Sequence, residues 1–331
     1  MDWRRNKMNI EIKDMSSSDF PEMAELWRES FPDMHLSVSD FQKQFEEFGI
    51  LPSECPVACT PSGVAGFAIA TDRRIPFIGT DPLPGCLACV VVGSKHRRKG
   101  IGSLLVKAAE RQLMEKGVKK IRIGYPTYLR GTFLSLIGVD IRWLGAVGLL
   151  QSLGYAPRRA LDSMILPLEN WQMPPEMVRK LEADSKVGIT FAALNPAEEN
   201  NIMSFLKHEF PGAWHDQFTD LLKANALNAK EVLIVKDQGK IAGFAGPFHI
   251  APNGDTCGVG LGLAAELRGR GLGMSLVYSI TDFVKKSGGR KLTLFGAVDK
   301  INYYGKAGFV PASTWLVFEK ICPEAKKRTN G

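Results

Sequence analysis

The sequence repeats itself, and this internal repeat constrains the possible folds more than any other feature. Residues 86–124 align without a gap on residues 257–295, and each residue of the first segment has its partner 171 positions later. Eight of the aligned pairs are identical. Shorter matches lie on both sides, 64–68 with 241–245 and 153–155 with 307–309. Because such self-similarity marks a duplicated structural unit, we expect two domains of the same kind.

The length of the chain agrees with two domains. A chain of 331 residues exceeds the size at which one hydrophobic core keeps growing. The proline-rich stretch that follows Leu166 has no counterpart inside either copy, which indicates a linker. We therefore expect a first domain over residues 1–166, a linker over 167–186 and a second domain over 187–331.

Charge and hydropathy exclude several classes of protein. The formal net charge of +7 is a mild excess, and the basic residues form no dense patch interleaved with aromatic residues, so we expect no nucleic-acid partner. The one long apolar stretch, residues 133–150, contains Asp140 and Arg142, which are costly in a membrane. Residues 1–7 are basic and have no apolar segment behind them, as expected of a cytoplasmic protein.

The six cysteines are interpreted as reduced thiols rather than as a disulfide framework or a metal site. Cys55, Cys59, Cys86 and Cys89 could suggest zinc. Cys86 and Cys89 flank an apolar run typical of a strand, where a separation of three places side chains on opposite faces. We expect no metal.

Both copies are predicted to contain a strand, a polar loop, an amphipathic helix and a second strand. In the second copy these elements are expected at residues 258–263, 264–270, 271–286 and 291–297, and in the first at 87–92, 93–99, 100–116 and 119–124. The helix of the second copy carries its apolar stripe on Leu272, Leu276, Val277, Ile280 and Val284. Each copy is therefore predicted to be an α/β domain.

The loop before each helix is rich in glycine and arginine. Glycines let the backbone approach a ligand closely, so several N–H groups and the positive end of the helix can face one anion. The loop of the second copy is Arg268-Gly269-Arg270-Gly271-Leu272-Gly273, and that of the first is Arg97-Arg98-Lys99-Gly100-Ile101-Gly102. The pattern is neither a Walker A loop nor a dinucleotide-binding fingerprint. It predicts a pyrophosphate site.

At these residues the chain resembles the GNAT superfamily of N-acetyltransferases, whose signature is Arg/Gln-x-x-Gly-x-Gly/Ala after the fourth strand. The resemblance covers both halves and implies two tandem GNAT-like domains, each a mixed, centrally splayed sheet flanked by helices. It also implies acetyl-CoA as cosubstrate and transfer of the acetyl group to a primary amine of a small molecule or a peptide-like acceptor.

The resemblance also implies which residues bind CoA. In the family the backbone of the splayed strand pairs with the pantetheine arm, and the loop amides bind the pyrophosphate. For the second copy these are Leu261, Gly262, Leu263, Arg268, Gly269, Arg270, Gly271, Leu272 and Gly273. For the first copy they are Val90, Val91, Val92, Arg97, Arg98, Lys99, Gly100, Ile101 and Gly102.

One tyrosine distinguishes the two copies. The family often uses a tyrosine as the acid for the CoA sulfur, in a Tyr-x-Lys-x-Gly-Phe pattern that this sequence matches from Tyr304 to Phe309. The first copy has Leu150 at that position, and leucine cannot donate a proton. We therefore expect the chemistry in the second copy and a catalytically degenerate first copy. The first copy also has a 17-residue insertion around residues 125–143, either for domain packing or to cover a substrate.

The sequence leaves the identity of the general base open. Where related enzymes carry a glutamate on the fourth strand, this sequence has Cys257. Glu231, His249, Asp255 and Glu266 are candidates, and a water chain is an alternative. Two other functions also stay open: a CoA-binding sensor or scaffold without turnover, and a transferase fed by charged tRNA, which the two pyrophosphate loops disfavour. The sequence names neither the acceptor nor the oligomeric state.

Overall fold

The computed structural model describes residues 9–32, 36–47, 49–72, 85–124, 138–223, 227–251, 253–258, 260–296 and 300–322. The first copy contains, in chain order, β1 (Glu11–Asp14), α1 (Phe20–Ser30), α2 (Val38–Glu47), β2 (Pro56–Thr60), β3 (Gly63–Thr71), β4 (Gly85–Val92), α3 (Ile101–Glu115), β5 (Lys120–Ile123), β6 (Val139–Asp140), α4 (Leu144–Ser152) and β7 (Ala156–Pro167). Short 3₁₀ turns η1 (Ser17–Asp19), η2 (Pro52–Glu54) and η3 (Ser94–His96) lie between them.

Helix α5 (Pro175–Lys186) lies between the copies. The second copy contains β8 (Ile189–Ala193), α6 (Glu199–Glu209), α7 (Ala213–Lys223), β9 (Leu233–Asp237), β10 (Lys240–Gly246), β11 (His249–Ile250), β12 (Asp255–Cys257), β13 (Gly260–Leu263), α8 (Leu272–Lys286), β14 (Lys291–Gly296), α9 (Ile301–Gly305) and β15 (Val310–Ile321). Its 3₁₀ turns are η4 (Pro196–Glu198), η5 (Ala229–Glu231) and η6 (Ala265–Leu267). The predicted strand, loop, helix and strand are present in both copies.

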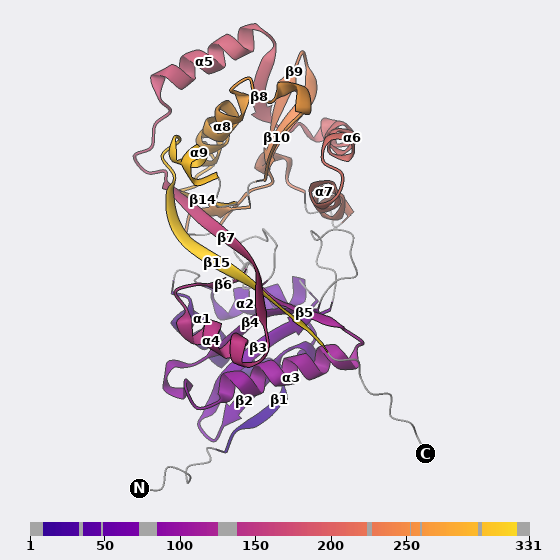
Figure 1. The fold of residues 1–331 in the computed structure, drawn as a ribbon, viewed down its shortest axis with the longest axis vertical. Coiled ribbons are helices and arrows are strands. Elements are labelled where there is room, and N and C mark those ends of the chain that lie inside the picture. The colour runs from indigo at the N-terminus through magenta and orange to yellow at the C-terminus, as the bar shows by residue number, and fades with distance from the viewer. Residues whose placement is uncertain are drawn as a thin grey trace.

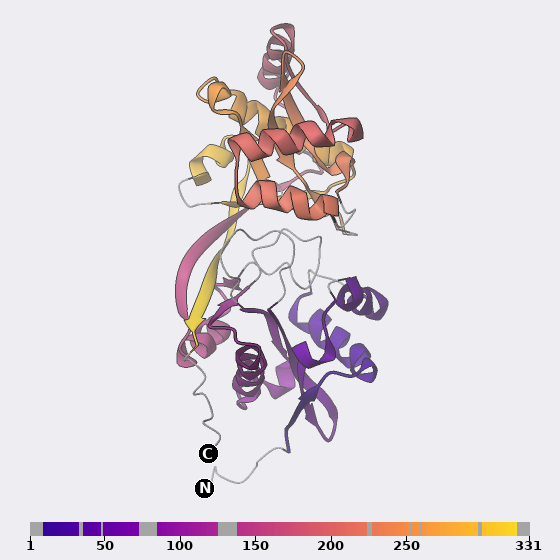
Figure 2. The ribbon, with the colours of Figure 1, turned by 90° about the vertical axis from the view of Figure 1, so that its right-hand side faces the viewer.

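The last strand of each copy completes the sheet of the other copy. Strand β7 pairs antiparallel with β14, from Asp162 opposite Gly296 to Pro167 opposite Lys291. Strand β15 pairs antiparallel with β5 of the first copy, with Phe318 opposite Ile123. The two strands also pair with each other along most of their length. Figures 1 and 2 show them crossing together from one half of the molecule to the other.

This exchange joins most strands of the described residues into one sheet in the order β1-β2-β3-β4-β5-β15-β7-β14-β12-β11, with β6 paired to β15. The remaining four strands form a second sheet in the order β13-β10-β9-β8. The larger sheet is mixed, because β4 runs parallel to β5 and β12 parallel to β14, while its other pairs are antiparallel. The four-stranded sheet is antiparallel throughout.

The fourth strand of each copy leaves its neighbour, as the resemblance implies. Strand β4 pairs with β3 up to Val92 but with β5 only as far as Leu87. In the second copy the separation is complete: β12 pairs with β14, while β13, a few residues later, pairs with β10 in the other sheet. Of the strand expected at residues 258–263, the structure has β13 over Gly260–Leu263, and Gly258 before it has a φ of +91°. The predicted fold class is confirmed.

Helices cover both faces of each sheet. Helix α3 buries Ile101, Leu105 and Leu113 in one core cluster, and α1 and α2 bury Trp27 and Phe41 in another. In the second copy, α8 buries the predicted apolar stripe, including Leu276 and Val284. The exchanged strand contributes to both halves, since Phe318 belongs to the core that α3 covers and Phe309, just before β15, to the core that α8 covers.

The cysteines that the structure describes are free, and Cys55, Cys86 and Cys89 are buried. Burial raises the pKa of the Cys89 thiol to about 12, so this side chain is a neutral packing group at physiological pH. Among the described residues no three potential metal ligands come together, and no helix is long and apolar enough to cross a membrane.

The strand exchange predicts that two core substitutions close together in the sequence destabilise different halves of the molecule. Phe318→Ala should lower the stability of the first half by about 3–5 kcal/mol, because its ring leaves a cavity beneath α3. Phe309→Ala should destabilise the second half instead. Hydrogen–deuterium exchange measures this directly: Phe318→Ala should reduce protection in α3 and β5, and Phe309→Ala in α8 and β14. Loss of protection confined to the second half in both variants would contradict the exchange.

Candidate functional site

The two glycine-rich loops have the same backbone conformation. Each begins with a 3₁₀ turn, passes through two residues of positive φ and enters a helix. The positive φ angles are 62° at Arg98 and 85° at Gly100 in the first copy, and 75° at Gly269 and 76° at Gly271 in the second. Only Arg98 is not a glycine, and the strain at this position is of order 1–3 kcal/mol.

The loops leave room for a ligand above the helix ends. A Cβ atom built on Gly100 or Gly269 would meet no heavy atom within 4 Å. Helices α3 and α8 begin without a side-chain cap, so the first backbone N–H groups lack a capping partner from their N-cap residue. Open space over uncapped N–H groups and a positive helix end fits a pyrophosphate group.

Arg97 and Arg268, which the sequence predicts as phosphate partners, also hold the loops in place. The Nε of Arg97 donates to the carbonyl oxygen of Val92 at 2.9 Å, and that of Arg268 to Leu263 at 3.0 Å. Each contact ties the loop to the end of the splayed strand that precedes it. The guanidinium of Arg268 also lies 5.8 Å from the ring centroid of Phe210.

A glutamate near the end of a preceding helix fixes the start of each loop. The backbone N–H of Ser94 donates to Glu29 Oε1 at 3.0 Å, and that of Ala265 to Glu209 Oε2 at 3.0 Å. Hydrogen bonds from Ser94 lower the pKa of Glu29, and the hydrogen bond from the Ala265 N–H lowers the pKa of Glu209. Both carboxylates therefore stay ionised at neutral pH and hold the loops.

The loops differ in charge, and the linker helix approaches the less basic one. Lys95 and Arg98 of the first loop align with Glu266 and Gly269 of the second. Helix α5 brings the Cε atom of Lys180 within 3.5 Å of a Cβ position on Gly271. Asp184 accepts hydrogen bonds from Lys180 Nζ at 2.9 Å and from Ser275 Oγ of α8 at 3.3 Å. The linker helix is thus attached to the first turns of α8.

A cavity of about 420 Å³ lies behind the second copy between α5, β8 and α8, away from its loop. A larger cavity of about 770 Å³ opens on the loop of the first copy. It follows the separated edge of β4 from Arg98 and Gly102 past Val92 and ends between Leu150 and Trp143. Seven of the predicted CoA-binding residues line it, namely Val90, Val91, Val92, Arg97, Arg98, Gly100 and Gly102.

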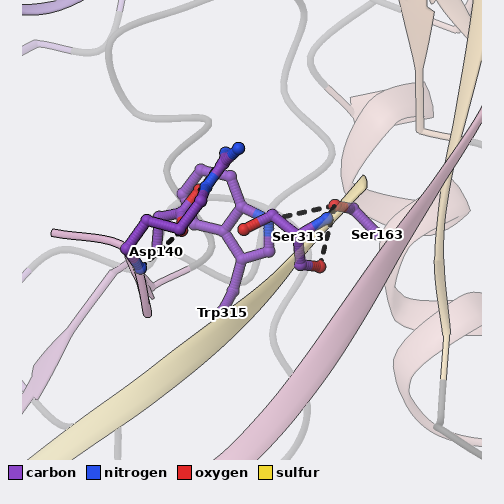
Figure 3. Close-up of polar contacts among 5 residues, drawn as sticks. Asp140, Ser163, Ser313 and Trp315 are labelled. Atoms are coloured by element: carbon purple, nitrogen blue, oxygen red, sulfur yellow. Dashed lines mark hydrogen bonds and ion pairs between the residues drawn. The ribbon is translucent and has the colours of Figure 1, made fainter. Parts of the chain in front are cut away.

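The far end of this larger cavity rests on the exchanged strands. The ring of Trp143 packs edge-on against Trp315 of β15 at 5.6 Å between centroids. Figure 3 shows the polar contacts behind it, where the Ser163 hydroxyl donates to the Ser313 carbonyl oxygen at 3.0 Å and accepts from the Trp315 indole at 3.3 Å. Residues 125–137 of the predicted insertion lie outside the described residues, whereas Trp143 forms part of the cavity wall.

In the second copy the candidate acid lies on the short helix α9. The rings of Tyr303 and Tyr304 are 5.3 Å apart and nearly perpendicular, so the two side chains take different directions. In the second copy, the Tyr303 hydroxyl lies 2.6 Å from the position that a Cβ atom on Gly273 would take. In the first copy, the Leu149 side chain lies 3.1 Å from the equivalent position on Gly102. This shared contact supports the alignment of Tyr304 with Leu150. No sequence pattern places Tyr303 beside the loop.

Strand β13, which carries Leu261, Gly262 and Leu263, is the edge strand of its sheet. One edge pairs with β10, and the other has no strand partner among the described residues. Such an edge can pair with the amides of a pantetheine chain. Gly262 must stay small, because a Cβ there would lie 2.7 Å from the rings of Phe210 and Phe244.

The structure brings together two of the four candidate bases. Glu231 Oε1 lies 3.9 Å from His249 Nδ1. Asp255 forms an ion pair with Lys291 at 2.6 Å, and Glu266 is exposed on the loop turn η6.

Comparison with known proteins identifies the family of both copies. The sequence profile described as the acetyltransferase (GNAT) family matches residues 20–126 and 200–309, one match in each copy. Mycothiol acetyltransferase from Corynebacterium glutamicum is 27% identical over 259 residues, which cover 75% of this chain and 79% of that protein.

Two solved structures have a similar fold. A tandem GNAT protein from the clavulanic acid biosynthesis pathway superimposes with a TM-score of 0.67 at 13% identity, covering 96% of this chain and 100% of that one. A GCN5-related glucosamine N-acetyltransferase region of a fungal multi-domain β-N-acetylglucosaminidase gives a TM-score of 0.71 at 17% identity, covering 96% of this chain and 38% of that one.

The rim of the larger cavity predicts a pH-dependent stability. Burial disfavours the charged form of Asp140, but hydrogen bonds from the Arg142 side chain and N–H outweigh it and lower the pKa of Asp140. Asp140→Asn should therefore cost about 1–3 kcal/mol at pH 7. Because a lowered folded-state pKa stabilises only above the unfolded value of about 3.9, the difference should disappear as the pH falls through the folded-state pKa.

Thermal unfolding between pH 7 and pH 3 measures this difference. A constant gap between the wild type and Asp140→Asn across that range would show that the carboxylate charge does not stabilise the fold.

Proposed function

The chain belongs to the GNAT family of acetyltransferases, and on that premise we propose that its second copy transfers the acetyl group of acetyl-CoA to a primary amine of a small-molecule or peptide-like acceptor. The observation that carries this proposal is the difference in side chain at one pair of equivalent positions in the two copies. Tyr304 follows the glycine-rich loop and splayed strand of the second copy, while Leu150 follows those of the first.

Acetyl-CoA, when bound, supplies an activated acetyl thioester. The N–H groups of Gly271, Leu272 and Gly273 would hold its pyrophosphate, and the free edge of β13 would pair with its pantetheine arm. Arg270 is exposed and its guanidinium can pair with further phosphate oxygens. These contacts fix the thioester in the gap between β13 and β14, where positioning lowers the barrier to attack.

Tyr304 would act at the end of that gap. A phenol is neutral at pH 7 in an ordinary environment, so its Oη can donate a proton to a departing thiolate. Packing against Phe309, with ring centroids 6.0 Å apart, supports the ring from one side. The Tyr304 proton would be replaced from water after the product leaves.

The first copy would hold CoA without turnover. Its loop carries more cationic residues and its cavity can accept a pantetheine arm, but Leu150 at the cavity end has no proton to donate. The alternative, that neither copy turns over and the protein is a CoA-binding sensor, predicts no consumption of acetyl-CoA with any amine.

The names of the similar proteins guide the choice of acceptor. One is a mycothiol acetyltransferase and another contains a glucosamine N-acetyltransferase region, so amino sugars belong among the first acceptors to assay. We further propose a cytoplasmic location, and no nucleic acid, membrane or metal partner.

The loops predict two separable CoA sites. Replacing Gly271 and Gly273 by valine should block the backbone from the pyrophosphate, since valine disfavours positive φ and a Cβ at 273 would meet the Tyr303 hydroxyl. The matched control replaces Gly100 and Gly102. Isothermal titration with CoA should lose one site in each variant, and acetyl transfer should stop only in the first. Unchanged CoA binding in both variants would remove the proposed phosphate sites.

The acid predicts a change in rate without a change in binding. Tyr304→Phe should lower kcat about 10²- to 10⁴-fold, the usual effect of losing an acid–base group, with little change in the KM for acetyl-CoA. Leu150→Ala, at the matched position, should reduce stability more than rate, because Leu150 is 4% exposed and packs in the first core. Thiol release measures both rates, and full activity of Tyr304→Phe would refute the assignment.

A further inference from the structure

His249 and Glu231 approach each other from two elements that are separate in the sequence. Glu231 ends the turn η5, just before β9, and His249 begins the two-residue strand β11. Glu231 Oε1 lies 3.9 Å from His249 Nδ1, and both side chains are largely buried, with exposures of 20% and 28%. The backbone N–H of Phe248 also donates to the Glu231 carbonyl oxygen at 2.9 Å, which holds the two elements together.

The strand register shows which way His249 points. Ile250 is paired with Thr256 across the antiparallel strands β11 and β12, so these side chains share a face of the sheet. Thr256 is fully buried, and its Oγ1 lies 2.8 Å from a Cβ position on Gly289, at the end of α8. That face is therefore the α8 face. Because side chains alternate along a strand, His249 points to the opposite face.

His249 also lies at the point where the strands separate. Thr256 is the last residue of β12 that pairs with β14. The backbone of His249 pairs with the next residue, Cys257. Beyond this point begins the gap between β13 and β14 in which acetyl-CoA is proposed to bind. His249 is therefore carried by a strand that pairs with β12 at this separation, and its side chain lies on the face opposite α8.

From this geometry we infer that His249 is the general base that accepts the proton of the acceptor amine, and that Glu231 positions its imidazole. The inference rests on the proposed function of the second copy. His249 Nδ1 lies 3.9 Å from the Glu231 carboxylate and has no hydrogen-bond partner among the described residues, so the carboxylate acts on the ring through its charge. A proton on Nδ1, on the side of the carboxylate, leaves the lone pair on Nε2. A base oriented by a neighbouring carboxylate is the usual arrangement for a histidine that removes a proton.

The protons balance in this assignment. The amine nitrogen forms a bond to the acetyl carbon, its proton passes to His249 Nε2, and the carbon–sulfur bond breaks. The sulfur takes the proton of Tyr304 Oη. The imidazolium then gives its proton to water and Tyr304 regains one, so the net products are an amide and a free thiol.

The surrounding charges favour this role for His249. Glu231 stabilises a transient imidazolium from η5. Asp255 and Lys291, on the neighbouring strands β12 and β14, neutralise each other at 2.6 Å and leave little net charge beside the ring. Glu231 is therefore the charged group that acts on the imidazole to which the acceptor amine would give its proton.

The test combines a rate with an NMR measurement that needs no substrate. His249→Asn should lower kcat about 10²- to 10⁴-fold while CoA affinity by calorimetry and the melting temperature stay near the wild-type values. The acidic limb of the wild-type pH–rate profile should be absent in this variant. His208→Asn is the matched control, because His208 also contacts a glutamate but is 84% exposed.

Glu231→Gln tests the positioning role. In the protein without ligand, the NMR chemical shifts of the His249 ring nitrogens should change in this variant, since the imidazole loses its carboxylate neighbour. The protein has five histidines, so His249→Asn identifies the resonances. Ring shifts that stay at their wild-type values would overturn the pairing.

Two outcomes separate this inference from the proposed function. An inactive Tyr304→Phe beside a fully active His249→Asn with an unchanged pH profile would overturn the base and leave the acid in place. Should His249→Asn unfold, His249→Gln and Glu231→Gln decide instead. A folded His249→Gln with the wild-type kcat and pH profile would contradict the role of His249 as the base. A folded Glu231→Gln with the wild-type kcat and pH profile would contradict the positioning role of Glu231.

Discussion

The backbone hydrogen bonds between β7 and β15 are the constraint on which the rest of the structure depends. Each of these strands begins in one copy and pairs with the fifth strand of the other, β7 with β14 and β15 with β5. Ordering the larger sheet therefore requires both copies to be present. The exchange also places Trp315, a residue of the second copy, behind the far end of the first-copy cavity. The two candidate sites consequently share one framework rather than two independent ones.

Duplication leaves two similar frameworks free to differ in chemistry. Both loops have the same positive-φ positions, the same arginine-to-strand hydrogen bond and the same glutamate contact at their start. They differ in the groups that would touch a ligand: Lys95 against Glu266, Arg98 against Gly269 and Leu150 against Tyr304. Features that hold the loop are retained, whereas groups that bind charge or move a proton have changed. This pattern is consistent with one copy that reacts and one that only binds.

Much of each copy could be predicted from the sequence, because local patterns determine it. The period of apolar residues in α8 and the glycines at its start are visible without any partner. The strand exchange could not be predicted, since the alternation in residues 310–321 does not identify which strand they pair with. The second role of Arg268 and the position of Tyr303 depend on how a loop and a helix dock. The approach of His249 to Glu231 likewise depends on the fold of β9 to β11, so the sequence could only offer both as candidates.

A crystal structure with a non-reactive acetyl-CoA analogue tests the central claim most directly. The account predicts the analogue between β13 and β14, its pyrophosphate on the N–H groups of residues 271–273 and its sulfur within hydrogen-bond distance of Tyr304 Oη. Density for the analogue in the first copy as well is compatible, with its sulfur beside Leu150. An analogue found only in the first copy, with the gap beside Tyr304 closed by side chains, would contradict the assignment of chemistry to the second copy.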